Sequence, residues 1–129
     1  MVLVREQVVV DAAQPAALGR WWANALGWVV TLEADDEYEI RSAPDQLPGL
    51  VFVPVGDSKI TKNRLHLDFR PDDRAAEVDR LLALGAHRVD VGQERQRWDV
   101  LADPEGNEFC VLAPRRVTDT GTQFVESVP

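Results

Sequence analysis

Residues 63–85, NRLHLDFRPDDRAAEVDRLLALG, contain the pattern that decides the fold. In the first part, leucine and phenylalanine alternate with polar residues, which predicts a strand over 63–69 with one apolar face. The second part begins at Pro71, places its apolar residues at helical spacing and ends at Gly85. The stretch therefore predicts a strand followed directly by an amphipathic helix.

The same order occurs near the start of the chain. Val8-Val9-Val10 predicts a strand over 4–11, and a helix with proline in its first turn follows. This helix ends in Ala25-Leu26-Gly27, which corresponds to Ala83-Leu84-Gly85 in the second half, 58 positions later. Two amphipathic helices can share such a triplet by chance, but the shared element order and spacing favour a duplicated unit.

Each half continues with three β-rich segments. They are predicted at 28–34, 36–41 and 50–55 in the first half, and at about 87–91, 97–102 and 107–113 in the second. The last two are joined by Asp103-Pro104-Glu105-Gly106-Asn107, a composition that type I turns prefer. The sequence thus predicts an α+β fold with two βαβββ modules, about 4–55 and 62–113, in one domain over 1–114.

The tail over 115–129 has no clear period. We expect it to fray, although Thr122-Gln123-Phe124-Val125 could add an edge strand to this chain or to a partner.

Charge and composition exclude several classes of function. The 129 residues include 14 Lys and Arg against 22 Asp and Glu, giving a net charge of −8 without a basic cluster, so we expect no nucleic-acid partner. No apolar run is long enough for a membrane span, and the first residues do not form a secretory signal. Cys110 has no intrachain partner for a disulfide. These features favour a cytoplasmic globular protein that does not bind membranes.

The chain resembles the vicinal oxygen chelate superfamily, which contains glyoxalases, bleomycin-resistance proteins and extradiol dioxygenases. The resemblance rests on the duplicated element order, on Ala25-Leu26-Gly27-Trp28, on Leu65-His66-Leu67-Asp68, and on Asp103 to Phe109. It covers about residues 4–114 and is nearest to small single-domain glyoxalase-like members. It implies that the modules pair into a curved, partly open mixed β-sheet barrel, with helices outside and a ligand cavity inside. Members are commonly homodimers, and the modules can pair within one chain or between two.

The resemblance also implies three positions for metal ligands. Catalytic members take them from the first strand of each module and from the last strand, which here correspond to Gln7, His66 and Cys110. Metal-using relatives usually carry Glu at the place of Cys110, and His or Glu at the place of Gln7. A glutamine amide is a weak ligand, whereas a thiolate suits zinc. We therefore expect no cofactor, with a divalent ion (Zn, Mn, Fe or Ni) as the alternative.

Each of these residues also has a simpler interpretation. His66 could hydrogen-bond on the polar face of its strand or contact a ligand directly, and Cys110 could be a small buried residue of the core. Glu108 lies two residues before Cys110, so strand alternation places both on one face. In that register the Glu108 carboxylate could replace a ligand or act as a catalytic base. His87, directly after a helix, is predicted to be on the surface.

Aromatic residues are the other candidates for ligand contact. Tyr38, Phe52 and Trp98 fall in predicted strands, where flat rings could line a cavity. Three tryptophans, Trp21, Trp22 and Trp28, are expected in core or dimer packing. The acidic residues Glu33, Asp35, Asp36, Glu37 and Glu39 are expected to form a solvated hairpin or, alternatively, a rim that attracts cations.

Three functions follow from these features. The first is a glyoxalase-like, bleomycin-resistance-type protein that binds a small molecule in a sheet-lined cavity without an intact metal triad. The second, which the resemblance implies, is a lyase, isomerase or transferase in which a divalent metal stabilises an enediolate or oxyanion. The third is an interaction domain without a ligand site.

Overall fold

The computed structural model describes residues 2–89, 98–118 and 121–123 of the chain. The chain divides into two compact units, Met1–Ser58 and Lys59–Pro129, here called the first and second units. Each begins with a strand, a helix and three further strands in that order, and the second unit adds two short strands in its tail. The prediction of an α+β fold with two βαβββ modules is therefore confirmed.

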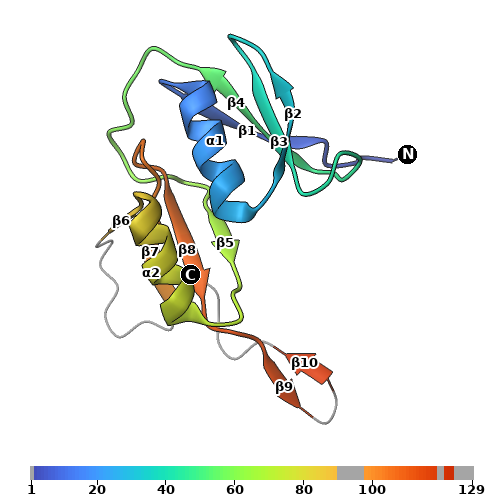
Figure 1. Cartoon of the computed structure of the whole chain (residues 1–129), viewed down its shortest axis with the longest axis vertical. Helices are drawn as coiled ribbons and strands as arrows, with labels where there is room; N and C mark the ends of the chain where they lie inside the picture. The colour runs from blue at the N-terminus through green and yellow to red at the C-terminus, as the bar shows by residue number, and fades with distance from the viewer. Residues whose placement is uncertain (1, 90–97, 119–120, 124–129) are drawn as a thin grey trace. The chain divides into compact units, whose positions relative to one another are not determined.

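The first unit is one mixed sheet with a helix on one face (Figure 1). Its elements are β1 (Gln7–Ala12), α1 (Pro15–Leu26), β2 (Val29–Glu33), β3 (Tyr38–Arg41) and β4 (Gly49–Pro54). The strand order is β1-β4-β3-β2, with β1 parallel to β4 and the other pairs antiparallel. A parallel pair needs a crossover connection, and α1 lies within it.

The core of the first unit lies between α1 and the sheet. The strand register places Val10, Phe52 and Tyr38 side by side on one face, and Leu18 and Trp22 of α1 are buried with them. The helix approaches this face closely at Gly19. A Cβ atom built on Gly19 would lie 2.2 Å from the Cδ1 atom of Tyr38, so the residue at this position must lack a side chain.

Both helices end as the repeated triplet predicts. Gly27 and Gly85 follow α1 and α2 (Arg74–Leu84) with left-handed φ angles of 67° and 115°. The backbone N–H of Gly27 donates to the carbonyl of Ala23, and that of Gly85 to the carbonyl of Leu82. Glycine adopts this conformation without the steric penalty of a Cβ atom, which explains why both helices stop there.

The second unit has the same architecture. Besides α2, it contains β5 (Leu67–Phe69), β6 (His87–Arg88), β7 (Trp98–Ala102) and β8 (Glu108–Leu112). The strand order is β5-β8-β7-β6, with β5 parallel to β8 and the other pairs antiparallel. On the α2 side of the sheet, Arg74 pairs with Asp99, and the rings of Phe69 and Phe109 meet edge to face. The opposite face carries the buried residues Val100, Cys110 and Leu112, with Val89 and Trp98 packed against them.

The starts of β5 and α2 differ from those predicted. β5 begins at Leu67 and not at residue 63, because the backbone N–H of Asn63 donates to the Glu108 carboxylate, outside the strand pairing. α2 begins at Arg74 and not at Pro71, since Asp73 caps the helix by accepting from the N–H of Ala76.

The tail also differs from the expectation of fraying. Within it, β9 (Arg116–Thr118) and β10 (Gly121–Gln123) form an antiparallel pair. The predicted edge strand over 122–125 thus overlaps β10, and its last two residues lie outside the described part of the chain. Residues 90–91 of the strand predicted at 87–91 also lie outside it, as does residue 97 of the strand predicted at 97–102.

The connection between β7 and β8 is the predicted turn. The N–H of Gly106 donates to the carbonyl of Asp103, and the fully buried Asp103 carboxylate accepts from the N–H groups of Glu105 and Asn107. The Asn107 amide donates to both oxygens of the same carboxylate. The Asp103 carboxylate therefore accepts the hydrogen bonds of the turn's backbone N–H groups, as the short side chain of Asp commonly does in turns.

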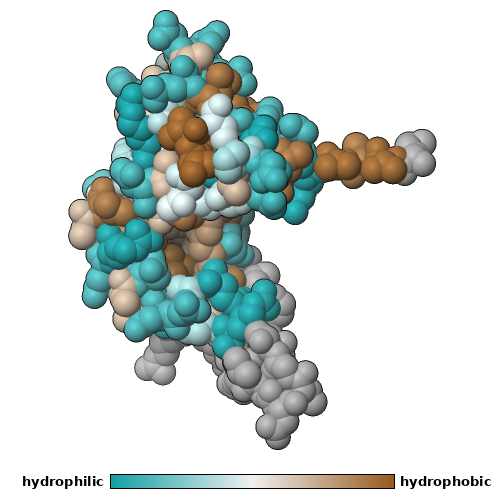
Figure 2. Space-filling model, turned by 45° about the vertical axis from the view of Figure 1, so that its right-hand side comes forward, coloured by the Kyte–Doolittle hydropathy of each residue, from teal (hydrophilic) through white to brown (hydrophobic). Residues whose placement is uncertain are grey.

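Two surface properties of the described residues bear on function. Neither helix is long and apolar enough to cross a membrane. Val2, Leu3 and Val4 are largely exposed ahead of β1, where Figure 2 shows a hydrophobic arm of the first unit.

Candidate functional site

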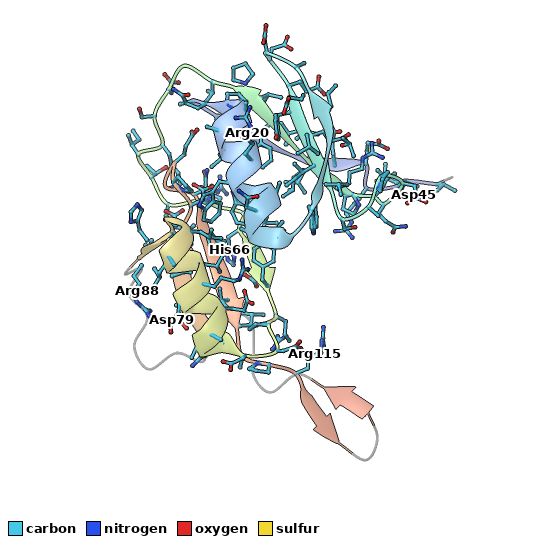
Figure 3. All side chains as sticks on the ribbon, in the orientation of Figure 1. Arg20, Asp45, His66, Asp79, Arg88 and Arg115 are labelled. Atoms are coloured by element: carbon cyan, nitrogen blue, oxygen red, sulfur yellow. The ribbon has the colours of Figure 1, made fainter. Side chains whose placement is uncertain are left out.

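His66, Asp68 and Cys110 meet on one face of the second unit. Asp68 in the edge strand β5 lies opposite Cys110 in the interior strand β8. His66, which is labelled in Figure 3, directly precedes β5. Strand alternation places His66 and Asp68 on the same side, and the parallel register places Cys110 beside them. In the described part of the chain, this is the single group of three or more His, Cys, Asp or Glu donors close enough to share one metal ion.

The three side chains are in direct contact. The Nδ1 atom of His66 lies 2.8 Å from Oδ1 of Asp68 and 3.9 Å from Sγ of Cys110. The side chains of His66 and Asp68 are 22% and 23% exposed, whereas Cys110 is 3% exposed. The cluster thus has a buried sulfur at its base and two polar groups that solutes can reach.

Cys110 is a neutral thiol in this arrangement. Burial raises its pKa to about 12, with a further increase from the charge and hydrogen bond of Asp68, and Lys62 acts weakly in the opposite direction. A thiol with this pKa is a poor nucleophile at neutral pH, because the thiolate is the reactive form. Cys110 therefore acts as a nonpolar wall of the site unless a cation displaces its proton.

Glu108 lies on the same face but its carboxylate is already occupied. Lys59 Nζ lies 2.8 Å from one oxygen, and the N–H of Asn63 lies 2.7 Å from the other. Burial raises the pKa of Glu108, but the hydrogen bonds from Lys59 and Asn63, with the Lys59 charge, outweigh it and the net pKa is lowered. The predicted alternation is confirmed, and the carboxylate holds the segment that leads to His66.

Two aromatic candidates lie away from an open sheet face. Tyr38 and Phe52 are buried against α1, with exposures of 1% and 0%. Strand periodicity shows which residues share a face, but not which face the helix covers. A role of these two rings in lining a cavity stays a prediction. Trp98 is different, because it is partly exposed and packs against Cys110 and its neighbours.

The remaining sequence candidates lie as follows. Gln7 is exposed at the start of β1, opposite Gly49 in β4. His87 is exposed in β6, as predicted. Of the three tryptophans near α1, Trp22 is buried, whereas Trp21 and Trp28 are partly exposed.

The acidic run divides into two groups. Glu33, Asp35, Asp36 and Glu37 are exposed, as a solvated hairpin would have them. Glu39 is not: it accepts a 2.6 Å hydrogen bond from Thr31 and pairs with Arg41 at 3.2 Å. The Thr31 hydrogen bond lowers the pKa of Glu39, burial acts against it, and Arg41 lowers the pKa further.

Sequence reasoning did not single out Asp68, Lys59 or Asn63. Asp68 had a signal, because it follows His66 by two positions in a strand and so shares its face. No sequence signal pointed to Lys59 and Asn63. They lie in an irregular segment, 49 and 45 positions before Glu108, the residue they contact.

The three donor atoms can be tested against the geometry of a metal site. Bonds of about 2.0–2.3 Å at tetrahedral angles place neighbouring donor atoms about 3.3–3.6 Å apart. All three donor atoms lie within 4.8 Å of one another, and the 3.9 Å between Sγ and Nδ1 is close to the ideal spacing. Small side-chain rotations would bring His66, Asp68 and Cys110 around one ion. These three residues therefore fit a bound divalent metal ion.

Comparison with known proteins identifies the family. A family model described as a glyoxalase-like domain matches residues 7–112. The chain belongs to this family. Its members fall within the vicinal oxygen chelate superfamily, so the resemblance is confirmed. Among curated proteins, none matches the chain.

Solved structures of glyoxalase-like proteins have the same fold. A glyoxalase/bleomycin resistance protein/dioxygenase family enzyme from Burkholderia phytofirmans PsJN is 18% identical, with a TM-score of 0.63 over 84% of this chain and 96% of its own. A glyoxalase-related enzyme from Fulvimarina pelagi is 13% identical, with a TM-score of 0.65 over 97% and 100%. The bleomycin-binding protein of Streptomyces verticillus, solved with copper(II)-bleomycin, is 16% identical, with a TM-score of 0.59 over 88% and 98%.

Proposed function

We propose that this glyoxalase-like protein binds a small molecule on the sheet face that carries His66, Asp68 and Trp98, without the family's metal triad. The observation that carries the proposal is the hydrogen-bonded pair of His66 and Asp68 on a sheet face that also carries the partly exposed Trp98, which packs on the cluster around Cys110. A ligand there would meet a donor, an acceptor and a flat apolar surface together, which is the usual composition of small-molecule sites.

The chemistry of the neighbouring residues supports binding without a metal. The position where metal-using relatives carry Glu holds Cys110, a neutral thiol. Glu108, the nearest alternative carboxylate, is engaged by Lys59 and Asn63. Hard divalent ions prefer carboxylate and water ligands, so this face suits them poorly.

The net charge of −8 favours a cationic ligand. The related bleomycin-binding protein was solved with copper(II)-bleomycin, and we extend that ligand class to this chain as part of the proposal. Cationic glycopeptides and planar basic compounds are therefore the first probes.

Thermal unfolding in the presence of these probes tests the proposal. A ligand at 100 times its Kd stabilises the folded chain by about 2.7 kcal/mol. His66→Ala and Trp98→Leu should remove this stabilisation, whereas the matched controls His87→Ala and Trp28→Leu should retain it. Equal stabilisation of wild type and His66→Ala, or none of wild type by any probe, would contradict the proposed site or ligand class.

The second candidate function is a divalent-metal-dependent lyase, isomerase or transferase. The close approach of the His66, Asp68 and Cys110 donor atoms favours it. A bound ion would polarise an oxygen of the substrate, and the chain would supply the ligands that hold the ion. Activity that survives exhaustive chelation unchanged would exclude this candidate.

We also propose that the protein is a cytoplasmic homodimer. A single cysteine without a disulfide partner is typical of reducing compartments. The exposed valines Val8, Val9, Val29 and Val30 at the sheet edges of the first unit supply apolar surface for a partner subunit. Light scattering on the purified chain tests the dimer, and a monomer across the accessible concentration range would refute it.

A further inference from the structure

We propose that Glu39 and Arg41 form a binding site for a zwitterionic small molecule, namely an α-amino acid with an apolar side chain. In this site Glu39 holds the ammonium group and Arg41 holds the carboxylate. The site lies in the first unit, whereas His66, Asp68 and Trp98 lie in the second. It uses no residue of the function proposed above, so each proposal can fail while the other stands.

Strand alternation places both charged residues on the face of the first-unit sheet away from α1. Tyr38 contacts α1 at Gly19, and Glu39 and Arg41 of the same strand point to the opposite side. In the described part of this unit α1 is the single helix and lies on the other face (Figure 1). The side chains of Glu39 and Arg41 are 12% and 22% exposed, so a solute can reach them from this side.

The Glu39 carboxylate is held in place and keeps spare acceptor capacity. Its Oε1 atom accepts a 2.6 Å hydrogen bond from Thr31, and its Oε2 atom accepts one from Arg41 at 3.2 Å. An ionised carboxylate has about four lone-pair sites, so each oxygen can accept one more hydrogen bond. The Thr31 hydrogen bond lowers the pKa of Glu39 despite its burial, and Arg41 lowers it further, so the group is ionised at neutral pH. It is therefore an oriented partner for an ammonium group.

Arg41 has more donors than acceptors around it. Its guanidinium group donates to Glu39 and to the backbone carbonyl of Pro44, each at 3.2 Å, which is the long end of the usual range. Its Nε atom is buried and meets no acceptor among the described residues, an arrangement that costs free energy. A carboxylate can pair with a guanidinium group through two parallel hydrogen bonds. A turn of the group away from Pro44 would offer Nε to a ligand carboxylate.

Gly49 of the neighbouring strand β4 makes room for both side chains. A Cβ atom built on Gly49 would lie 3.1 Å from Oε2 of Glu39 and 3.4 Å from Cγ of Arg41. The backbone does not require glycine here, because the φ angle of Gly49 lies outside the left-handed region. The absence of a side chain at this position therefore serves the two charged residues.

The same face carries apolar side chains next to the charged pair. Glu39 lies opposite Val51 in β4, and Val51 lies opposite Val9 in β1. Val51 is buried, whereas Val9 is 51% exposed. An α-amino acid bound through both of its charges can lay an apolar side chain on these valines. It also adds no net charge, so neither Glu39 nor Arg41 is left unbalanced.

An NMR titration of the isotope-labelled full chain tests the site. The probes are L-leucine, isocaproate, which is leucine without its ammonium group, and isoamylamine, which is leucine without its carboxylate. We expect the amide signals of Thr31, Glu39 and Arg41 to shift and saturate with L-leucine at a Kd of about 1 mM or tighter, as suits a small ligand on an open face. Both analogues should bind about tenfold or more weakly, because each lacks one charged hydrogen-bonding group.

Variants that remove one charge give the second readout. Glu39→Gln keeps an acceptor for Thr31 and should weaken L-leucine binding by about tenfold or more. The same variant should bind isocaproate more tightly than the wild type does, because Arg41 has lost its charged partner. Arg41→Gln should likewise weaken L-leucine binding and strengthen isoamylamine binding. The controls Glu37→Gln and Arg5→Gln, both exposed in the first unit, should leave all three affinities unchanged. A pair with a structural role alone would not exchange its charge preference in this way.

Gly49→Ala tests the same site without a change of charge. The added Cβ atom should displace the Glu39 carboxylate and weaken L-leucine binding, while circular dichroism of each variant checks that the fold is kept. No shift of the Thr31, Glu39 or Arg41 amides at tens of millimolar L-leucine would overturn the site. Equal affinity of the wild type for L-leucine and for either analogue would overturn the assignment of a zwitterionic ligand.

Discussion

Asp68 lies directly opposite Cys110 in the parallel pairing of β5 with β8. This register brings a carboxylate next to a thiol that is 3% exposed. Burial raises the pKa of the thiol to about 12, and the charge of Asp68 adds to the effect. The sulfur is therefore protonated throughout the physiological range and is protected from both solvent and reagents.

We predict that Cys110 resists alkylation in the folded protein. With a pKa of about 12, about one thiol in ten thousand is ionised at pH 8, compared with roughly a quarter for an exposed cysteine of pKa about 8.5. Iodoacetamide should therefore modify the native chain at least about 100 times more slowly than the chain in denaturant, as followed by mass spectrometry.

Asp68→Asn serves as the comparison for this prediction. Removing the Asp68 charge should make the native thiol react slightly faster, whereas Asp79→Asn should not change the rate. Native alkylation as fast as in denaturant would show that the sulfur is exposed, and would also remove the basis for a neutral Cys110.

Much of the fold could be predicted because the controlling signals are local. The glycine stops, the turn around Asp103 and the alternation of apolar residues each depend on a few neighbouring positions, and all appear in the structure. It was harder to predict which face of a sheet its helix covers. Tyr38 and Phe52 lie beneath α1 because the helix crosses that side, which a period of two residues does not reveal.

The candidate site was predicted only in part, because some of its contacts depend on a segment without regular structure. His66 and Cys110 were identified by position, but the engagement of Glu108 by Lys59 and Asn63 depends on the irregular path of residues 59–66. Side chains that meet through such a path leave no periodic signal. Asp68 could have been identified from the alternation that placed His66, because both lie on one side of one strand.

The ion pair of Lys59 with Glu108 should stabilise the second unit. Both side chains are largely buried, and hydrogen bonds to charged groups contribute about 1.5–3 kcal/mol. We expect Glu108→Gln and Lys59→Met each to lower the free energy of unfolding by about this amount at pH 7 in urea denaturation. The double variant should lose less than the sum, because the two residues share one interaction.

The same pair predicts a pH dependence. The folded-state pKa of Glu108 is lowered from its ordinary value of 4.5, so the folded state favours the ionised carboxylate. The stabilisation is complete well above pH 4.5 and is lost as the pH falls through the folded-state pKa. The difference between wild type and Glu108→Gln should therefore shrink in acid. Exposed Glu37→Gln is the control, and a difference that grows in acid would contradict this assignment.

The Asp103 carboxylate should be the main stabilising contact of the β7–β8 turn. It is fully buried and accepts hydrogen bonds from two backbone N–H groups and from the Asn107 amide. Asp103→Ala leaves those donors without their acceptor, so we expect a loss of about 2–3 kcal/mol in the free energy of unfolding. Exposed Asp72→Ala should change stability by less than about 0.5 kcal/mol. Similar values for the two variants would mean that water replaces the carboxylate without cost.

Gly19 in α1 should be intolerant of any side chain. A Cβ atom there would lie 2.2 Å from Cδ1 and 2.7 Å from Cε1 of Tyr38, whose ring is buried and cannot turn away freely. Alanine favours helices by about 1 kcal/mol over glycine, but overpacking costs about 1–3 kcal/mol, so we expect a net loss of stability for Gly19→Ala in thermal unfolding. Gly56→Ala is the control, because nothing lies within 4 Å of its added Cβ atom. If Gly19→Ala raised the melting temperature instead, α1 would have to lie farther from β3 than the contact with Tyr38 requires.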